Sequence, residues 1–485
     1  MNINYLTKLL TNILFFHAIG LSAQVTIGSA IAPVEGALLE LKQDGETTKG
    51  LGLPRVYLIA PDNLAPCVID ASPTTKDAHT GLVVYNQTED NGLSKGIYVW
   101  DGAIWERLLF TESSTNPVTT PSDANSNAFI LPLGKSLEIP VTKAYDMWEK
   151  YSMLGNQTLT GQVTAEVYWS DVSGLVDISL PNGDNGRTSV IRITHNKTND
   201  QLGGNAVVAV RVGGIVRWSW HIWVTGYDPD NEGRVYTYSN GTDTNIFMDR
   251  NLGALSNNPA DGFLTLGNTY EWGRKDPFPR PSGLDNPSTS TSAPETILYG
   301  VKTDITRTTT NENPDENLQN SITDPLQYIG YNSWFIGNNY LYNNEDADFW
   351  GQMSQSKGDF DPCPAGWRIP FVSADGRSPW EGLQESDVTL VVVEGKAGSA
   401  FDFSDKLGLY PLSGGRSNDA NLVGRQFDGT VPIGEKGFYW TASHSYKDAS
   451  CYFGIVNHGT YLQIINTGID VNRKALGSSV RCVKA

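Results

Sequence analysis

The sequence predicts a multidomain protein that is built mainly from β-strands. Its 485 residues exceed the length of one ordinary hydrophobic core, so we expect two to four domains. The composition is rich in glycine (49 residues) and in tryptophan and tyrosine (13 and 21), whereas only 18% of the residues are charged. This balance is typical of β-rich domains rather than of helical or disordered chains. Short apolar runs separated by turn residues recur along the chain and indicate strands.

The chain begins with a segment, residues 1–23, that is typical of a secretory signal peptide. Lys8 precedes a mostly apolar run at 9–19, and the small residues Ser22 and Ala23 stand before an expected cleavage point, although Leu21 is larger than is usual there. The alternative is an uncleaved membrane anchor, but the run is too short to span a bilayer. No cysteine stands near the cleavage point, so a lipoprotein anchor is not encoded. We expect a secreted or cell-surface protein without a membrane span.

Residues 24–110 are expected to form a small β module. The run at 96–108 has the pattern of a β-hairpin, with Asp101 and Gly102 at the turn and aromatic residues on both sides. The order of runs resembles the short N-terminal modules of surface and fibre-like proteins from Bacteroidetes. A module of this size is small for an independent core, and we expect it to need a neighbouring domain or a partner chain.

The next segment, 111–127, is rich in Ser, Thr, Asn and Pro and is predicted to be a linker. Residues 128–228 then show roughly seven alternating runs, with turn signals every 8–12 residues. This spacing is typical of an immunoglobulin-like β-sandwich.

One run of this sandwich, WSWHIW at 218–223, is unusually rich in tryptophan. Strand alternation places Trp218 and Trp220 on one face, and His221 and Trp223 on the other. Paired tryptophans can form a platform for a carbohydrate. Burial in the core is the commoner use of such residues, and we favour it here.

The chain offers no recognisable catalytic or metal-binding pattern. An acidic turn at 227–233 partly matches a calcium loop, but Ser239 stands where the bidentate glutamate is expected, so we interpret it as a turn. His444 and His458 have no third metal ligand at a recognisable spacing. Acidic pairs such as Asp359 with Asp361 lie in polar loops and do not define a hydrolase cleft. We therefore expect no catalytic residues, no metal and no cofactor.

The formal net charge of −18 excludes one class of partner. A protein that binds nucleic acid needs a basic face for the phosphate backbone, and an acidic chain of this kind does not favour one. The charge is compatible with a soluble protein that binds neutral glycans or protein surfaces.

Six motifs in the second half of the chain occur in one fixed order. They are MDRNLGA (248–254), YEWGRKDPFP (270–279), DPCPAGWRIP (361–370), LYPLSGGR (409–416), GFYWTAS (437–443) and GSSVRCVK (477–484). Together they resemble the Fibrobacter succinogenes major paralogous domain, which is found on secreted and surface proteins of Bacteroidetes. The resemblance covers residues 231–485, with a polar stretch at 281–316 that we expect to be an exposed insertion.

The resemblance implies a C-type-lectin-like α+β domain that serves display and binding, with no established chemistry. It also implies a disulfide between Cys363 and Cys482, because both residues lie in family motifs. The alternative is that all four cysteines are reduced and buried. A short helix is expected at 380–384. Formylglycine-generating enzymes share this fold class, but Cys451 and Cys482 do not reproduce their copper-binding pair.

The segment 439–480 is the expected binding region, because Tyr, Ser, Asn and Gly dominate adaptable binding surfaces. In some relatives this segment is the target of a diversity-generating retroelement, which rewrites adenines. The alternative is an ordinary fixed surface loop. The expected ligand-binding residues are Ser443, His444, Ser445, Tyr446, Cys451, Gly454, Val456, His458, Gly459, Tyr461, Gly468 and Asp470. Tyr446, His458 and Tyr461 are the expected anchors, and Trp367, Trp440 and Arg481 belong to the scaffold.

These observations predict a secreted or cell-surface protein for adhesion or ligand binding, such as a fimbrial tip or accessory subunit. Its partner would be a protein or glycan on another cell or on a phage surface, together with other surface or pilus subunits. The absence of a lipoprotein cysteine argues against lipoprotein-type pilus assembly. The alternative function is a secreted carbohydrate-active enzyme with an unrecognised site.

Overall fold

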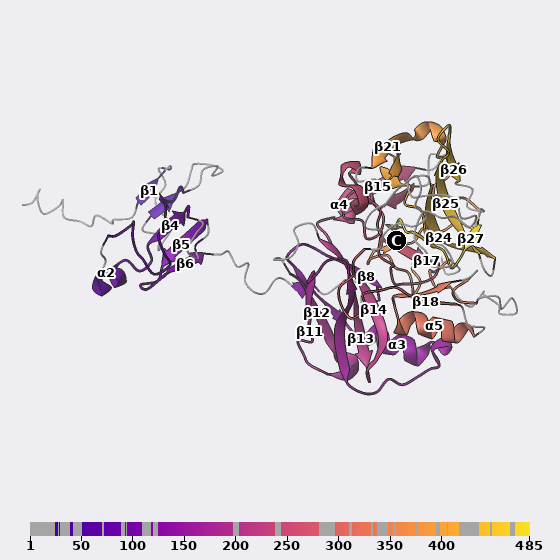
Figure 1. Cartoon of the computed structure of the whole chain (residues 1–485), viewed down its shortest axis with the longest axis horizontal. Coiled ribbons are helices and arrows are strands. Elements are labelled where there is room, and N and C mark those ends of the chain that lie inside the picture. Colours follow the sequence, from indigo (N-terminus) through magenta and orange to yellow (C-terminus); the bar gives the residue numbers. More distant parts are fainter. Residues whose placement is uncertain are drawn as a thin grey trace, which may run out of the picture. The chain divides into compact units, whose positions relative to one another are not determined.

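The computed structural model shows a mainly β, multidomain protein, as predicted. It describes residues 25–27, 29, 39–41, 51–69, 72–88, 93, 95–108, 118–119, 125–196, 203–237, 244–280, 296–309, 313–330, 333–336, 348–352, 356–373, 376–393, 398–404, 406–416, 436–446, 449–465 and 471–485. The chain divides into two compact units, Met1–Ser114 and Thr115–Ala485. The boundary falls inside the segment 111–127 that the sequence assigns to a linker. Elements from both units are labelled in Figure 1 where there is room.

The N-terminal unit contains one four-stranded sheet and one two-stranded sheet. Strands β3 (Arg55–Val56), β4 (Val83–Asn86), β5 (Gly96–Trp100) and β6 (Trp105–Leu108) lie in that order, and β1 (Val25–Ile27) pairs with β2 (Leu39–Leu41). Helix α2 spans Pro73–Ala78 and is capped by the side chain of Ser72. The expected hairpin at 96–108 is confirmed: the Asp101 carboxylate accepts the backbone N–H groups of Ala103 and Ile104, each at 2.7 Å.

The first part of the C-terminal unit contains two four-stranded sheets. One has the order β10 (Val163–Ser170), β13 (Gly204–Val212), β14 (Ile215–Val224) and β8 (Ala128–Leu131); the other has β11 (Val176–Ser179), β12 (Val190–His195), β9 (Ser136–Pro140) and β7 (Val118–Thr119). Residues of both sheets share one hydrophobic cluster, so the predicted residues 128–228 do form paired sheets. Their immunoglobulin-like topology stays a prediction.

A helix that the sequence did not predict, α3 (Thr142–Lys150), lies between β9 and β10. Its buried residues include Ala144, Tyr145 and Trp148, which recur at the three- and four-residue spacing of one helix face. Single-turn helices η1 (Ser152–Leu154) and η2 (Gly186–Thr188) occur in the same region.

The sheet that contains β14 is buried on both faces. Val208 and Val210 of β13 belong to the cluster shared with Ile139 and Ile191 of the second sheet. On its other face, Val207, Ala209 and Val216 form a separate cluster with Phe278, Leu298, Leu326 and Tyr328 from later in the chain. Trp218, Trp220 and Trp223 are therefore all fully buried, and the interpretation of these residues as core is confirmed.

The second part of the C-terminal unit contributes four sheets of its own (Figure 1). Their strands are β15 (Arg234–Thr237), β16 (Thr244–Phe247), β29 (Val483–Lys484) and β20 (Trp367–Arg368); β17 (Thr269–Glu271), β28 (Gly477–Ser479), β24 (Lys436–Tyr446), β25 (Ala449–Asn457), β26 (Leu462–Ile465) and β27 (Val471–Arg473); β18 (Thr306–Thr309) and β19 (Gln327–Gly330); and β21 (Thr389–Val393), β22 (Gly398–Asp402) and β23 (Leu409–Pro411). The helices are α4 (Pro229–Glu232), η3 (Pro259–Thr265), α5 (Pro314–Thr323) and η5 (Glu385–Asp387).

The prediction of a short helix at 380–384 is wrong. These residues form turns, and only the single turn η5 follows them. Gly382 has φ of 89°, which a helix cannot include. Trp380 instead stacks on Phe453 at 4.7 Å between ring centroids, and its indole N–H donates to the hydroxyl of Tyr410 at 3.1 Å. Core packing of the tryptophan determines this backbone.

The structure describes only part of the polar insertion expected at 281–316. Residues 281–295 lie outside the described part of the chain. From residue 296 onward the chain packs against the sandwich: Tyr299 and Ser170 exchange backbone hydrogen bonds of 2.7 and 2.9 Å, and Leu298 is buried. This portion is docked on β10 rather than wholly exposed.

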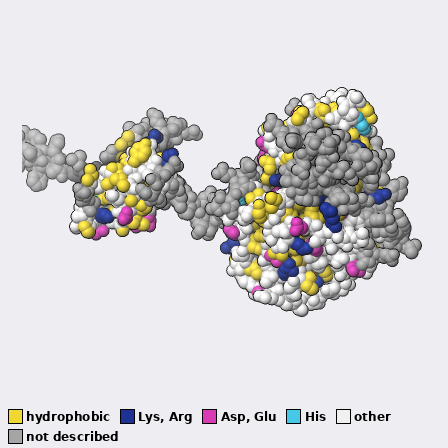
Figure 2. Space-filling view, in the orientation of Figure 1, with side chains coloured by type: hydrophobic (Ala, Val, Ile, Leu, Met, Phe, Trp, Pro, Cys, Tyr) yellow, Lys and Arg dark blue, Asp and Glu magenta, His cyan; other side chains and the backbone are white. Residues whose placement is uncertain are grey.

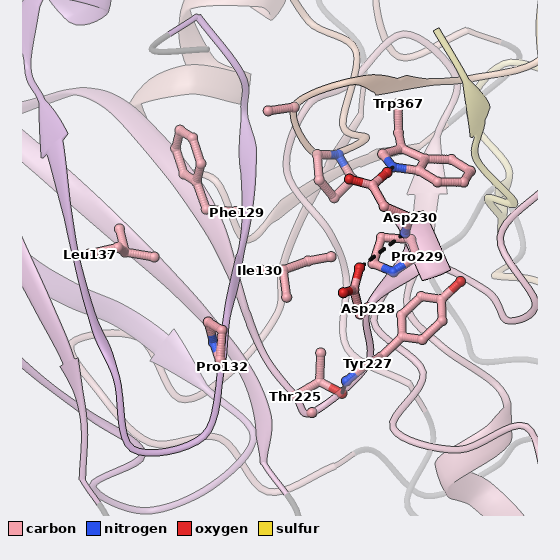
Figure 3. Close-up of a pocket in the computed structure, with 13 residues that line it drawn as sticks. Phe129, Ile130, Pro132, Leu137, Thr225, Tyr227, Asp228, Pro229, Asp230 and Trp367 are labelled. Carbon is pink, nitrogen blue, oxygen red and sulfur yellow. Dashed lines mark hydrogen bonds between the residues drawn. The ribbon is translucent and has the colours of Figure 1, made fainter. Parts of the chain in front are cut away.

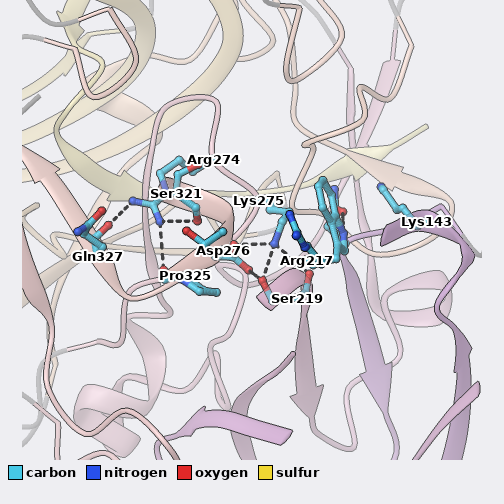
Figure 4. Close-up of polar contacts among 12 residues, drawn as sticks. Lys143, Arg217, Ser219, Arg274, Lys275, Asp276, Ser321, Pro325 and Gln327 are labelled. Carbon is cyan, nitrogen blue, oxygen red and sulfur yellow. Dashed lines mark hydrogen bonds and ion pairs between the residues drawn. The ribbon is translucent and has the colours of Figure 1, made fainter. Parts of the chain in front are cut away.

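A buried polar cluster joins the sandwich to the rest of the C-terminal unit (Figure 4). The Lys275 ammonium donates to the hydroxyl of Ser219 at 2.5 Å and to Asp276 at 2.6 Å, and Ser219 donates to the other Asp276 oxygen at 2.7 Å. Burial lowers the pKa of Lys275 to about 8, while the neighbouring Asp276 acts in the opposite direction. The ion pair is enclosed, so each charge depends on these partners.

Arg274 forms a second connection beside this cluster (Figure 4). Its guanidinium donates to the Glu271 carboxylate at 2.7 Å and to the backbone carbonyls of Gln327, Ser321 and Pro325 at 2.5, 3.3 and 3.1 Å. One side chain therefore holds the end of α5 and the start of β19 against β17.

His221 occupies the same interface in its neutral form. Its Nε2 lies 2.9 Å from the side-chain oxygen of Asn205, whose amide nitrogen already donates to Asp171 and to the carbonyl of Gly253. His221 therefore carries its proton on Nε2, and Nδ1 accepts from the Tyr270 hydroxyl at 3.4 Å. Complete burial lowers the pKa of His221 to about 3.

The expected disulfide between Cys363 and Cys482 is confirmed, and it joins residues 119 positions apart. Both cysteines are fully buried. Cys67 and Cys451 carry thiols. The bond fastens the segment before β20 to the segment before the last strand, β29.

We expect removal of this disulfide to destabilise the C-terminal unit by about 4–5 kcal/mol, because it closes a loop of more than a hundred residues in the unfolded chain. A Cys363→Ser/Cys482→Ser double variant compared with the wild type in urea unfolding would measure the loss. Cys67→Ser is the control, since Cys67 lies in the other unit. Equal midpoints for all three proteins would contradict the prediction.

We also expect the C-terminal unit to lose stability as the pH falls from 7 to 5. The unfolded chain binds a proton at His221 near pH 6.5, whereas the folded chain does so only near pH 3, so acid favours unfolding in this window. Protonation of His221 in the unfolded chain lowers the free energy of unfolding by about 2 kcal/mol between pH 7 and pH 5. The slope of the free energy of unfolding against pH, compared between wild type and His221→Gln, would measure this effect. An unchanged slope in His221→Gln would refute the assignment.

Candidate functional site

Four of the expected ligand-binding residues are buried in the structure, so they are corrected here. Ser443, Cys451 and Val456 are 2%, 5% and 4% exposed. Gly454 is also buried, and a Cβ atom at this position would meet the Tyr452 ring at 2.8 Å. The reason is that Ser443 lies on β24 and the other three on β25, which are neighbouring strands inside a six-stranded sheet, and β25 is buried along nearly its whole length. These residues belong to the scaffold rather than to an exposed binding face.

For five further candidates, the side chain or the whole residue lies outside the described part of the chain. The backbone of His444, Ser445 and Tyr446 belongs to the end of β24, but their side chains lie outside the described part. Gly468 and Asp470 lie outside the described residues altogether. Their place in a binding face stays a prediction.

The remaining candidates, His458, Gly459 and Tyr461, come together at the exposed turn between β25 and β26. The rings of His458 and Tyr461 stack with centroids 4.2 Å apart and planes inclined by 17°. The His458 backbone N–H donates to the Tyr461 carbonyl at 3.0 Å, and the imidazole Nε2 lies 2.9 Å from the amide oxygen of Gln463. Tyr461 is 59% exposed. The hairpin thus brings two of the three expected anchors into contact.

This turn has the chemistry of a small recognition surface. A stacked aromatic pair presents a flat apolar area that loses little conformational freedom on binding. Polar groups border it: Gln463 and Thr460 are exposed, and the Asn457 side chain accepts the backbone N–H of Gly459 at 2.9 Å. Sugar rings and peptide side chains are both recognised by such a combination of ring stacking and amide hydrogen bonds.

A second feature, which the sequence did not reveal, is a cavity of about 510 Å³ between the sandwich and the later strands (Figure 3). Phe129, Ile130 and Leu137 of β8 and β9 line one side. The segment that ends the sandwich, with Tyr227 and Pro229, and the indole of Trp367 line the other. No sequence signal could have found it, because its two walls come from segments far apart in the chain.

The carboxylates at the edge of this cavity are engaged by the protein. Asp228 caps α4 by accepting the backbone N–H of Asp230 at 3.1 Å and the side-chain amide of Asn231 at 2.7 Å. Asp230 accepts the indole N–H of Trp367 at 3.1 Å and pairs with Lys484, and this pairing lowers the pKa of Asp230. The acidic segment is therefore a capped turn, as interpreted from the sequence.

Within the described residues, His, Cys, Asp and Glu side chains do not gather in a group of three or more that could hold a metal ion. The same part of the chain contains no helix that is both long enough and apolar enough to cross a membrane.

The N-terminal unit differs from the C-terminal unit in its surface. About half of the exposed large hydrophobic side chains among the described residues lie in this small unit. They are Ile27, Leu39, Leu41, Leu51, Tyr57, Ile59, Ile69, Tyr85 and Ile104. Exposed apolar side chains mark interaction sites where they form a contiguous patch.

A comparison with protein families relates this unit to assembly. Residues 26–122 match a family described as a phage tail-like trimerisation region. No curated protein matches the chain, and no solved structure matches it. The N-terminal part is therefore similar to a structural, oligomer-forming region. The C-type-lectin-like fold expected for residues 231–485 stays a prediction.

We expect Tyr461→Ala to change the free energy of unfolding by less than about 0.5 kcal/mol, because the side chain is exposed at a turn. The same substitution at Tyr439, which is fully buried, is the matched control and should cost about 3–5 kcal/mol. Trp367→Ala should cost a similar amount. Urea unfolding of the three variants would check this separation of exposed from core residues. A large loss in the free energy of unfolding for Tyr461→Ala would show that the hairpin belongs to the scaffold.

Proposed function

We propose that this chain is a non-enzymatic, surface-associated adhesion protein that assembles as a trimer. The N-terminal unit forms the trimer, and the C-terminal unit displays a binding surface. The observation that carries the proposal is the match of residues 26–122 to a trimerisation region. The proposed location is the cell surface or the exterior, in line with the signal peptide expected at 1–23.

The N-terminal unit has the physical properties of a module completed by partner chains. Its core is small, with Trp100, Trp105 and Tyr98 as its largest buried side chains. A four-stranded sheet of this size gains limited stability from its own core. Association with other copies would bury part of this exposed apolar surface and supply the missing stability.

The C-terminal unit supplies the proposed binding surface. The stacked pair of His458 and Tyr461 lies at the turn that follows β25, which is buried along nearly its whole length, so the pair is attached to a packed strand of the scaffold. Three copies on one trimer would bind a repetitive ligand with an avidity well above that of a single site. We propose a protein or glycan on another cell or on a phage surface as the ligand, with other surface or pilus subunits as further partners.

Diversification by a retroelement is a further part of this proposal. Variation would alter recognition at exposed positions such as His458, Gly459 and Tyr461, whereas changes at buried Cys451 or Val456 would disturb packing. The flanking DNA tests this directly. A reverse transcriptase gene together with a near-copy of the last coding segment would support it, and their absence would remove it.

We predict that the full-length protein sediments as a species with three times the mass of one chain at micromolar concentration. Sedimentation velocity analysis, with mass from light scattering, would measure this. A concentration-independent monomer would refute the proposed assembly.

The purified trimer would then be applied to glycan and protein arrays beside Tyr461→Ala, with a panel of hydrolase substrates in parallel. Saturable binding that Tyr461→Ala weakens by about 2 kcal/mol, or roughly thirtyfold, would support the proposed surface. Substrate turnover without saturable binding would instead indicate an enzyme.

A further inference from the structure

The four-stranded sheet of the N-terminal unit has two unlike faces. One face carries Val84, Tyr98 and Trp100, which are 2%, 3% and 0% exposed. The segment after β3, through Leu58 and Leu64, packs on these residues and completes the core. This face is therefore closed by the unit itself.

The opposite face, here called the outer face, is defined by two rows of residues in register. Arg55, Tyr85 and Ile97 lie side by side on β3, β4 and β5, and Val83, Val99 and Glu106 lie side by side on β4, β5 and β6. Strand alternation places both rows away from the core. Tyr85 is 37% exposed, and Val83, Ile97 and Val99 are half-buried. The centre of the outer face is thus apolar and accessible to solvent.

A hollow of about 500 Å³ lies over this face. Arg55, Tyr85 and Ile97 line it together with Leu51, which is 68% exposed. Figure 2 shows hydrophobic side chains gathered on the visible face of the N-terminal unit. Open apolar surface of this kind is stabilised by burial against another surface.

We propose that the outer face of β3, β4 and β5, with the hollow beside Leu51, is the surface through which copies of this chain associate into a trimer. The occupant is a second copy, because these residues fall inside the segment 26–122 that matches a trimerisation region. This inference rests on the assembly proposed above and adds the surface that carries it.

The charges on the outer face fit a ring of identical copies. Exposed Arg55 lies on the edge strand β3, and exposed Glu106 lies on the opposite edge strand β6. In a three-fold ring each copy contacts its neighbour through two different patches. Head-to-tail contact on the outer face can therefore pair Arg55 of one copy with Glu106 of the next.

The test compares three variants of the full-length protein by sedimentation velocity. Ile97→Glu and Tyr85→Glu place a charge at the centre of the outer face. Ile69→Glu is the matched control: Ile69 is 76% exposed, but it follows Val68, which packs on the core side of the sheet. We expect both outer-face variants to sediment as monomers at concentrations where wild type and Ile69→Glu are trimers.

Circular dichroism would verify that each variant is folded. As a measurement that needs no variant, carbene footprinting of wild type should show residues 51–55, Tyr85 and Ile97 protected at concentrations that give trimers, and Ile69 labelled at all concentrations. Two results would overturn this inference alone. One is that folded Ile97→Glu and Tyr85→Glu variants are still trimers; the other is that the wild-type trimer protects residues outside the outer face instead. A monomeric wild type would overturn the proposed assembly as well.

Discussion

Burial of the β10-β13-β14-β8 sheet on both faces is the constraint on which the C-terminal unit depends. One face packs on the second sheet of the sandwich, and the other packs on strands that follow in sequence. Polar side chains on the second face would be severely destabilising without partners. Ser219 meets Lys275 and Asp276, and His221 meets Asn205 and Tyr270. The sandwich and the later strands therefore pack together within one compact unit.

The motifs that are far apart in the sequence converge on one buried cation. Arg481, which is fully buried, donates to the Asn251 side chain at 2.8 and 3.0 Å, and to the carbonyls of Met248 and Leu409 at 3.2 and 2.7 Å. Its guanidinium also lies 4.0 Å from the centroid of the Tyr410 ring. A buried guanidinium needs most of its five donors satisfied. This requirement explains why three of the motifs carry particular residues at these positions, and the disulfide at Cys482 holds the same segment in place.

The same packing restricts where the protein can bind a partner. Strands β24 and β25 are covered where their side chains are described, so the exposed positions of the expected binding segment, among the described residues, are the turn at 458–461 and Gln463 beside it. Such a surface can change in sequence without disturbing the core, because turns lie outside the packed layers. The N-terminal unit is different. The segment after β3 covers one face of its four-stranded sheet, and the outer face remains available for association.

The sequence by itself determined the features that arise from local patterns and from family motifs. Strand alternation and turn residues predicted the mainly β fold, the hairpin around Asp101 and the buried tryptophans at 218–223, and the motifs implied the disulfide between Cys363 and Cys482. Of the expected binding face, it named His458 and Tyr461 as anchors but also included Ser443, Cys451 and Val456. Only the tertiary structure decided that these three are buried, because burial of a strand depends on which layers cover it. The cavity beside Trp367 and the outer face around Tyr85 were decided in the same way, since each is formed by segments that meet only in the folded chain.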